Sequence, residues 1–327
     1  MKYRTFPKLS QQVSEVGLGC WQIGAEWGPV SDETAQRLLC AAWDAGVDFF
    51  DTAAIYGRGR RARRIGRFMR ETGARPFLAT KLGRMPDPGW PHNFRPEVVR
   101  RHVEASLRRL GVDCIDLVQL HCVPLEVLER GEMFDALRNL QQEGLIRAFG
   151  ASVETFREAE VCLRDPDCAS LQVIFNLFRQ DPRDRLFDRC AAQGVAILAR
   201  LPLSSGLLGG RMGAHTRFTP DDHRHYNRDG QAFHVGETFT GLPFTRGLEL
   251  VEELRAMAPA YVDLPLFAQR FILDHPAVTT IIPGATRPAQ VAHNAKASDA
   301  APLSAALHHR IAAWERDHVR PHVRGHG

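Results

Sequence analysis

The sequence predicts one (β/α)8 TIM-barrel domain over residues 1–327, on the strength of three observations. Eight short apolar runs alternate with amphipathic helical patterns almost from end to end. Continuously apolar strands that alternate with helices are typical of a parallel sheet buried on both faces. Eight such units in about 300 residues favour a closed barrel over an open doubly wound sheet. No low-complexity linker interrupts the pattern, so a single domain is expected.

The expected strands follow one another along the whole chain. They are residues 16–21, 47–51, 77–82, 114–121, 146–152, 171–176, 195–200 and 278–283. The helical patterns between them include residues 32–46, 96–111 and 132–144, and the last two end in glycine, a common helix stop. Ser31 precedes the first of these helices and is expected to cap it.

Two segments lie outside the repeating pattern. Residues 2–17 have the length of a short N-terminal hairpin that covers the bottom of the barrel. Residues 202–245 form a long loop after the seventh strand, rich in Gly, Asp, His and Arg. Loops of this length in compact domains are usually functional or disordered, and this one follows a strand end where barrel active sites are built. We expect residues 203–245 to form a mobile cover over the site. Its His and Asp residues match no regular metal spacing, so no metal is predicted.

Composition narrows the class of protein. An apolar fraction of 44% and a charged fraction of 24% are those of an ordinary globular chain. Seven cysteines occur singly without a CxxC pair, which predicts a reducing, cytoplasmic location. The N-terminus lacks an apolar signal region, and no apolar run approaches the roughly 18 residues of a membrane span. The net charge of +4 is mild and dispersed, so neither nucleic acid nor a membrane is an expected partner. A monomer or weak homo-oligomer is expected.

Four titratable residues cluster at the expected strand ends. Asp51 ends the second strand, Lys81 the third and His121 the fourth, while Tyr56 lies in the loop directly after the second. The carboxyl ends of barrel strands share one face, which is where barrel active sites lie. Packing alone hardly explains four residues of complementary chemistry at matched positions, although each singly could be a loop cap or a core residue.

The types of these residues suggest proton transfer to an oxygen. A free tyrosine has a pKa near ~10, too high for an efficient acid at neutral pH. A neighbouring ammonium favours the phenolate, and an adjacent carboxylate keeps that ammonium charged and in place. The chain has only four lysines among its many arginines, so Lys81 stands out as a compact point charge that Arg could not replace. His121 would orient the substrate oxygen through a hydrogen bond.

With these motifs, GVDFFDTAAIYG, LATKLG and LVQLHC, the chain resembles the aldo-keto reductase family over nearly its whole length. The resemblance implies that Tyr56 is the general acid, assisted by Lys81, Asp51 and His121. It also implies hydride transfer between NADP(H) and a carbonyl carbon, so that an aldehyde or ketone is reduced to the alcohol. No strand–GxGxxG–helix fingerprint of a Rossmann site is present.

The resemblance also implies a set of cofactor contacts. Ser152 and Gln172 would hold the nicotinamide carboxamide, although Val153 replaces an Asn that usually shares this task. Arg200 stands where an aromatic ring usually stacks on the nicotinamide, a role that a planar guanidinium could keep. The segment IIPGATRPAQVAHN would bind the adenosine end through its loop amides and helix start, with Arg287 on the 2′-phosphate and His293 in place of a usual Glu. The full set is Gly19, Cys20, Trp21, Ser152, Gln172, Arg200, Leu203, Ser205, Gly206, Gly284, Ala285, Thr286, Arg287, Gln290 and Asn294.

The substrate is a small carbonyl compound whose identity the loops determine. Expected substrate contacts are Trp21, Trp27, Tyr56, His121 and Tyr226. An apolar mouth lined by Trp21, Trp27, Phe218, Tyr226 and Phe233 would suit aromatic or aliphatic aldehydes, and sugars also stack on aromatics. Two alternatives stay open. One is a cofactor-binding regulatory subunit on the same barrel, like the potassium-channel β subunits. The other is a metal-dependent barrel enzyme.

Overall fold

A computed structural model describes residues 1–24, 30–55, 59–260 and 262–325. Tyr56 and Trp27 lie outside the described residues. The chain begins with an antiparallel hairpin of β1 (Tyr3–Phe6) and β2 (Gln11–Ser14), as predicted. Eight further strands follow in one parallel sheet: β3 (Leu18–Gly19), β4 (Phe49–Asp51), β5 (Phe77–Leu82), β6 (Ile115–His121), β7 (Ile146–Ser152), β8 (Cys168–Ile174), β9 (Ala196–Arg200) and β10 (Val278–Ile281).

The strands are paired in the order of the sequence, and the sheet closes on itself. Each strand from β3 to β10 pairs in parallel with the next. Parallel bridges join Val16 to Ile281 and Gly19 to Gly284, so the first strand also meets the last. A Cβ on Gly19 would lie 2.6 Å from the carbonyl oxygen of Ile282. The glycine is therefore required by barrel closure, and the (β/α)8 fold class is confirmed.

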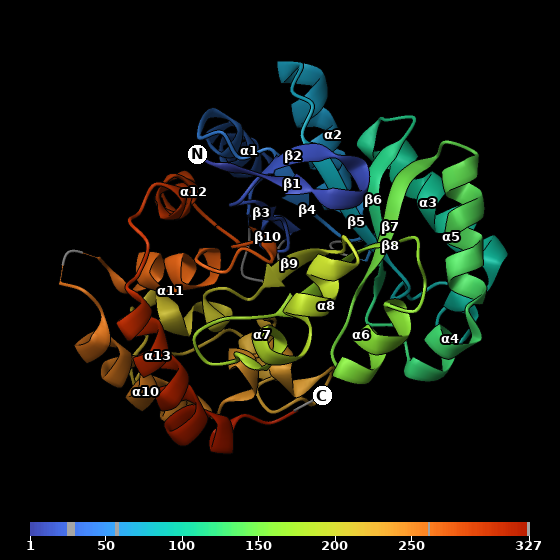
Figure 1. The fold of residues 1–327 in the computed structure, drawn as a ribbon. Coiled ribbons are helices and arrows are strands. Elements are labelled where there is room, and N and C mark those ends of the chain that lie inside the picture. The colour runs from blue at the N-terminus through green and yellow to red at the C-terminus, as the bar shows by residue number, and fades with distance from the viewer. Residues whose placement is uncertain (25–29, 56–58, 261, 326–327) are drawn as a thin grey trace.

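Helices surround the strands, as Figure 1 shows. They are α1 (Asp32–Asp44), α2 (Arg60–Thr72), α3 (Pro96–Leu110), α4 (Leu125–Arg130), α5 (Glu132–Gln142), α6 (Phe156–Cys162), α7 (Asp181–Arg185), α8 (Phe187–Ala192), α9 (His223–Tyr226), α10 (Phe244–Met257), α11 (Leu264–Leu273), α12 (Pro288–Ala295) and α13 (Ala305–Trp314). The Ser31 side chain caps α1 by accepting from the backbone N–H of Thr34 at 3.1 Å. Within the described residues no helix is long and apolar enough to cross a membrane.

The hairpin closes one end of the barrel. Phe6 and Val13 are fully buried, and Phe6 packs on Phe77 with ring centroids 5.2 Å apart. Phe77 stacks in turn on Phe49 at 5.1 Å. These rings belong to an apolar cluster that continues through Leu117 and its neighbours in the barrel interior. Aromatic side chains therefore fill this end of the barrel, opposite the end where the strands terminate.

The long loop after β9 folds into three short 3-10 turns, Ser204–Gly209, Val235–Glu237 and Phe239–Gly241, and the helix α9. Its polar residues bind one another in the interior. Asn227 is fully buried, accepts from the backbone N–H groups of Ala232 and Phe233 at 2.9 and 2.8 Å, and donates to Thr238 Oγ1 at 3.2 Å. These hydrogen bonds define one conformation for the cover, and its predicted mobility stays a prediction.

Candidate active site

One cavity of about 880 Å³ lies at the carboxyl ends of the strands. Asp51, Lys81 and His121 line one end of it, and Arg287 and Asn294 line the other. Every described residue of the predicted catalytic and cofactor sets lines this cavity except Cys20. The residues predicted from the sequence therefore line one cavity, and their roles in it stay predictions.

A buried ion pair stands at the centre of the catalytic end. Lys81 and Asp51 are 2% and 4% exposed, and the Lys81 ammonium donates to Asp51 Oδ2 and to the carbonyl oxygen of Thr52. The other carboxylate oxygen, Oδ1, accepts from the side-chain amides of Gln172 at 2.9 Å and Gln119 at 3.4 Å. Adjacent strands β4 and β5 deliver the pair. A buried charge pair is stable only when its remaining lone pairs are also satisfied, and here the two amides satisfy them.

His121 ends β6 and is buried at the cavity wall. Burial lowers the pKa of its imidazole well below the ordinary value, and the nearby cations Arg84, Lys81 and Arg200 lower it further. The ring is therefore neutral at neutral pH. A neutral imidazole carries one N–H donor and one acceptor nitrogen, so His121 has a single N–H with which to orient a ligand oxygen.

Arg200, expected to stack on a nicotinamide ring, is engaged in an ion pair. Its Nη1 lies 2.6 Å from Glu237 Oε2, with side-chain exposures of 8% and 11%, and its Nη2 donates to the carbonyl oxygen of Val153 at 3.2 Å. Glu237 comes from the long loop and lines the same cavity. Burial acts to raise the pKa of Glu237, but Arg200 and Arg84 outweigh it and the pKa is lowered, so the carboxylate is ionised. Sequence reasoning missed Glu237.

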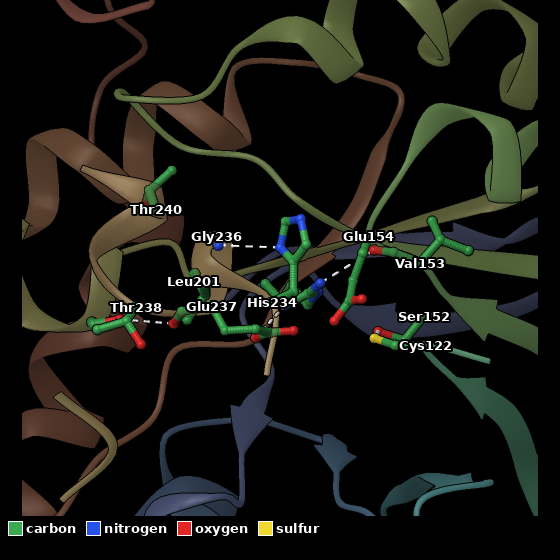
Figure 2. A network of polar contacts seen from close by, with 12 residues as sticks. Cys122, Ser152, Val153, Glu154, Leu201, His234, Gly236, Glu237, Thr238 and Thr240 are labelled. Atoms are coloured by element: carbon green, nitrogen blue, oxygen red, sulfur yellow. Dashed lines mark hydrogen bonds and ion pairs between the residues drawn. The ribbon is translucent and has the colours of Figure 1, made fainter. Parts of the chain in front are cut away.

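Further charged groups lie beside this pair. Figure 2 shows His234 and Glu237 from the long loop close to Glu154 and Cys122, which follow β7 and β6. Ligand-type atoms of Cys122, Glu154 and Glu237 lie within 4.8 Å of one another. Arg84 binds Glu154 at 2.8 Å, and burial raises the pKa of Cys122 to about 12. Both carboxylates hold a guanidinium and the thiol keeps its proton, so this donor set is ill suited to a cation.

Trp21 borders the cavity as predicted and packs against a residue that the sequence did not suggest. Its ring lies 4.7 Å from that of His223, which is fully buried in α9 of the long loop. Burial lowers the pKa of His223 to about 4. The contact is thus between two uncharged rings, and it fixes the loop against the end of the first strand.

At the far end, the loop before α12 satisfies its own amides, against expectation. Gln290 Oε1 accepts from the Thr286 N–H at 2.9 Å, the Thr286 hydroxyl at 3.1 Å and the Arg287 N–H at 3.1 Å. Asn294 Oδ1 accepts from Gln269 at 3.2 Å. Gln290 and Asn294 therefore hold the loop and helix in place. The backbone N–H groups of Thr286 and Arg287 already donate to Gln290, so they are not free to bind a phosphate. Arg287 is exposed at the cavity and offers a guanidinium at that end.

His293, the residue in place of a usual Glu, faces a carboxylate. Its Nε2 lies 3.0 Å from Oδ2 of Asp263, the residue that caps α11, and both line the cavity. The two side chains join α11 and α12 across this end of the cavity.

Two residues predicted as ligand contacts, Cys20 and Tyr226, lie outside the cavity lining, and each has a packing reason. Cys20 is fully buried beneath the wall, with its thiol 3.6 Å from the Leu18 carbonyl oxygen. Tyr226 is 37% exposed and packs edge-on against Phe233, outside the cavity lining. Phe218 packs on Phe239 and Phe244 instead of facing the mouth. The loop aromatics therefore bind one another and do not form the expected apolar mouth.

Comparisons with known proteins agree with this arrangement. The Aldo/keto reductase family model matches residues 15–316. The chain is 29% identical over 302 residues to the aldo-keto reductase YhdN of Bacillus subtilis, covering 89% of this chain and 87% of that protein. It is 30% identical to the aldo-keto reductase yakc [NADP(+)] of Schizosaccharomyces pombe, covering 76% and 72%.

Solved structures superpose over almost the whole chain. The holo form of aldo-keto reductase AKR11C1 from Bacillus halodurans has a TM-score of 0.78 at 26% identity, covering 96% of each chain. The glycerol dehydrogenase AKR11B4 from Gluconobacter oxydans has a TM-score of 0.79 at 29% identity, covering 97% of this chain and 96% of that one.

Proposed function

The chain belongs to the aldo/keto reductase family, and we propose that it reduces the carbonyl group of an aldehyde or ketone to the alcohol with NADPH. The observation that carries the proposal is the buried Lys81–Asp51 pair beside a neutral His121 at one end of a long cavity. A buried ion pair beside a histidine whose pKa is strongly lowered, both on the wall of a cleft, is typical of a catalytic site.

NADP(H) is the cofactor, and the residues present fit it. One curated relative is named for NADP(+), and a cavity of about 880 Å³ lies toward the upper end of the range for small-molecule and cofactor sites. Ser152 and Gln172 are buried polar groups at the catalytic end, whereas the exposed Arg287 lines the other end. When bound there, the nicotinamide supplies hydride to the carbonyl carbon.

The chain's own residues would manage the proton. His121, neutral and with one N–H, holds the carbonyl oxygen, and Tyr56 gives that oxygen its proton as general acid. Tyr56 lies outside the described residues, so its role is inferred from its place five residues after Asp51. The Lys81 ammonium favours the phenolate left after proton transfer, and Asp51 holds the ammonium in position.

The second proposal concerns substrate polarity. The cavity wall that includes His121 also carries the Arg200–Glu237 ion pair, and the aromatic side chains of the loop pack elsewhere. A substrate would meet hydrogen-bonding groups there, which favours a polar carbonyl compound over an aromatic aldehyde.

The test is NADPH oxidation by the purified protein with a panel of aromatic, aliphatic and hydroxylated aldehydes and ketones. The proposal expects turnover on at least one member, with hydroxylated compounds favoured. Tight NADPH binding without turnover on any carbonyl would contradict it and would support the regulatory-subunit alternative.

A further inference from the structure

Two buried glutamines support the catalytic carboxylate from inside the barrel. Gln119 on β6 and Gln172 on β8 are 0% and 1% exposed. Both side-chain amides donate to Asp51 Oδ1, at 3.4 and 2.9 Å, and Gln172 Nε2 also lies 3.5 Å from Gln119 Oε1. The three side chains thus form a closed triangle of hydrogen bonds.

These glutamines lie one layer above an apolar layer of the barrel interior. Leu117, two residues before Gln119 on the same strand, belongs to the interior cluster with Phe49, Phe77 and Ala79. Buried polar side chains are retained where they are hydrogen-bonded. Gln119 does not line the cavity, so its amide serves only the neighbouring side chains.

The chemistry of the carboxylate fixes the orientation of both amides. A carboxylate oxygen that is bound to an ammonium only accepts hydrogen bonds, so each glutamine must turn its NH2 group toward Asp51. Gln119 Oε1 then faces Gln172 and accepts its second N–H. Both hydrogens of the Gln172 amide are therefore used, and its Oε1 is the atom that Gln172 offers to a ligand in the cavity.

We propose that Gln119 is a positioning residue with two effects, one on the cofactor and one on the catalytic pair. By accepting from Gln172, it keeps the Gln172 Oε1 oriented to accept a hydrogen bond from the NH2 of the nicotinamide carboxamide. By donating a second hydrogen bond to Asp51 Oδ1, Gln119 helps to fix the carboxylate so that Oδ2 stays aligned with Lys81. The inference rests on the proposed NADPH site, and it names the residue that links that site to the catalytic pair.

The first test measures binding without any substrate. Dissociation constants for NADPH and for its 3-acetylpyridine analogue, in which a methyl ketone replaces the carboxamide, are measured for wild type and Gln119→Leu. Wild type is expected to discriminate against the analogue by about 2- to 10-fold, since the analogue lacks the NH2 donor. In Gln119→Leu the amide of Gln172 keeps its hydrogen bond to Asp51 but loses its second partner. It can then pivot about that one bond, so the discrimination should fall toward unity. An unchanged ratio in Gln119→Leu would overturn the proposal.

Two further variants separate positioning from packing. Leu117→Met alters the same strand one layer below without touching a polar group, and its ratio should equal that of wild type. Gln119→Met keeps the length of the side chain and removes the donor and the acceptor of the amide, so it replaces Gln119→Leu if that variant does not fold. Loss of discrimination in Leu117→Met as well would reduce Gln119 to a packing residue.

The second test uses the reaction. Gln119→Leu should lower kcat about 10-fold and shift the pH at which kcat is half-maximal, with the KM for NADPH rising by no more than about 10-fold. A lower kcat with an unshifted pH profile would contradict the effect on Asp51. The two proposals fail separately, because the binding ratio needs no turnover. An inactive wild type with a Gln119-dependent ratio would remove only the reductase assignment.

Discussion

Replacing Glu237 by Gln should destabilise the protein far more than an ordinary surface substitution. The change keeps the shape of the side chain and removes the charge that balances Arg200. The pair is 2.6 Å apart, with side chains 8% and 11% exposed. The guanidinium would stay buried in the cavity wall, because its Nη2 also binds the Val153 carbonyl oxygen.

The magnitude follows from burial. Removing one partner of a buried ion pair costs about 3–5 kcal/mol, mostly from the charge left uncompensated. Glu154 also attracts Arg200, so the lower end, about 3 kcal/mol, is expected. The entropy of unfolding is about 2.1 cal/mol/K per residue, and the chain has 327 residues. A fall in Tm of about 4 °C therefore follows.

Calorimetry or circular dichroism of the thermal transition measures this difference. The matched control is Glu71→Gln, which breaks the Arg67–Glu71 pair at 2.6 Å with exposures of 55% and 45%. An exposed ion pair contributes little to stability, so the Tm of Glu71→Gln should fall by less than about 1 °C. Arg200→Met in the Glu237→Gln background removes the stranded charge and should restore most of the loss. Equal small shifts in Glu237→Gln and Glu71→Gln would refute the reasoning.

Three further predictions concern the lysine, the cofactor and acid. Lys81→Arg keeps the charge, yet carbonyl reduction should fall about 10-fold or more because a planar guanidinium does not fit the compact place beside Asp51; wild-type rates with an unchanged pH profile would count against it. Arg287→Ala should weaken NADPH binding about 10- to 100-fold and leave NADH binding nearly unchanged in direct titrations. Equal weakening of both cofactors would contradict a contact between Arg287 and the 2′-phosphate. Burial lowers the pKa of His223 to about 4, and an unfolded His titrates near ~6.5, so protons bind the unfolded state first and stability is lost as the pH falls from about 6.5 toward 4. Urea unfolding at pH 7 and pH 5 should show a loss of about 2 kcal/mol from this residue that His223→Gln lacks; the same loss in both proteins would contradict it.

The alternation of apolar strands and amphipathic helices was enough to predict the barrel, because an apolar run and an amphipathic pattern are both local properties of the sequence. The predicted residues lie on one cavity for a related reason: parallel strands end on the same face, so Asp51, Lys81 and His121 meet once the strands are placed. The length of the first barrel strand, expected at residues 16–21, was less predictable. Only Leu18–Gly19 pairs regularly, since closure there depends on contacts with the distant β10.

Side-chain partners across the fold were beyond the sequence. Glu237 follows Arg200 by 37 positions in a loop without periodicity, so nothing local pairs the two. The sequence suggests Gln290 as a cofactor contact, whereas in the structure its side-chain oxygen accepts hydrogen bonds from backbone N–H groups of the preceding loop. Tyr226 was placed in the substrate mouth by residue type alone, whereas Phe233 gives its ring a closer partner.

Replacement of Tyr56 by Phe tests the proposed chemistry most directly, because the ring stays and only the transferable proton is lost. The measurement is kcat for carbonyl reduction together with the dissociation constant of NADPH, each compared with wild type. General acids contribute about 100-fold or more, so kcat should fall at least that far while NADPH binding changes by less than about 3-fold. A Tyr56→Phe enzyme that keeps more than about a tenth of the wild-type kcat would contradict Tyr56 as the acid.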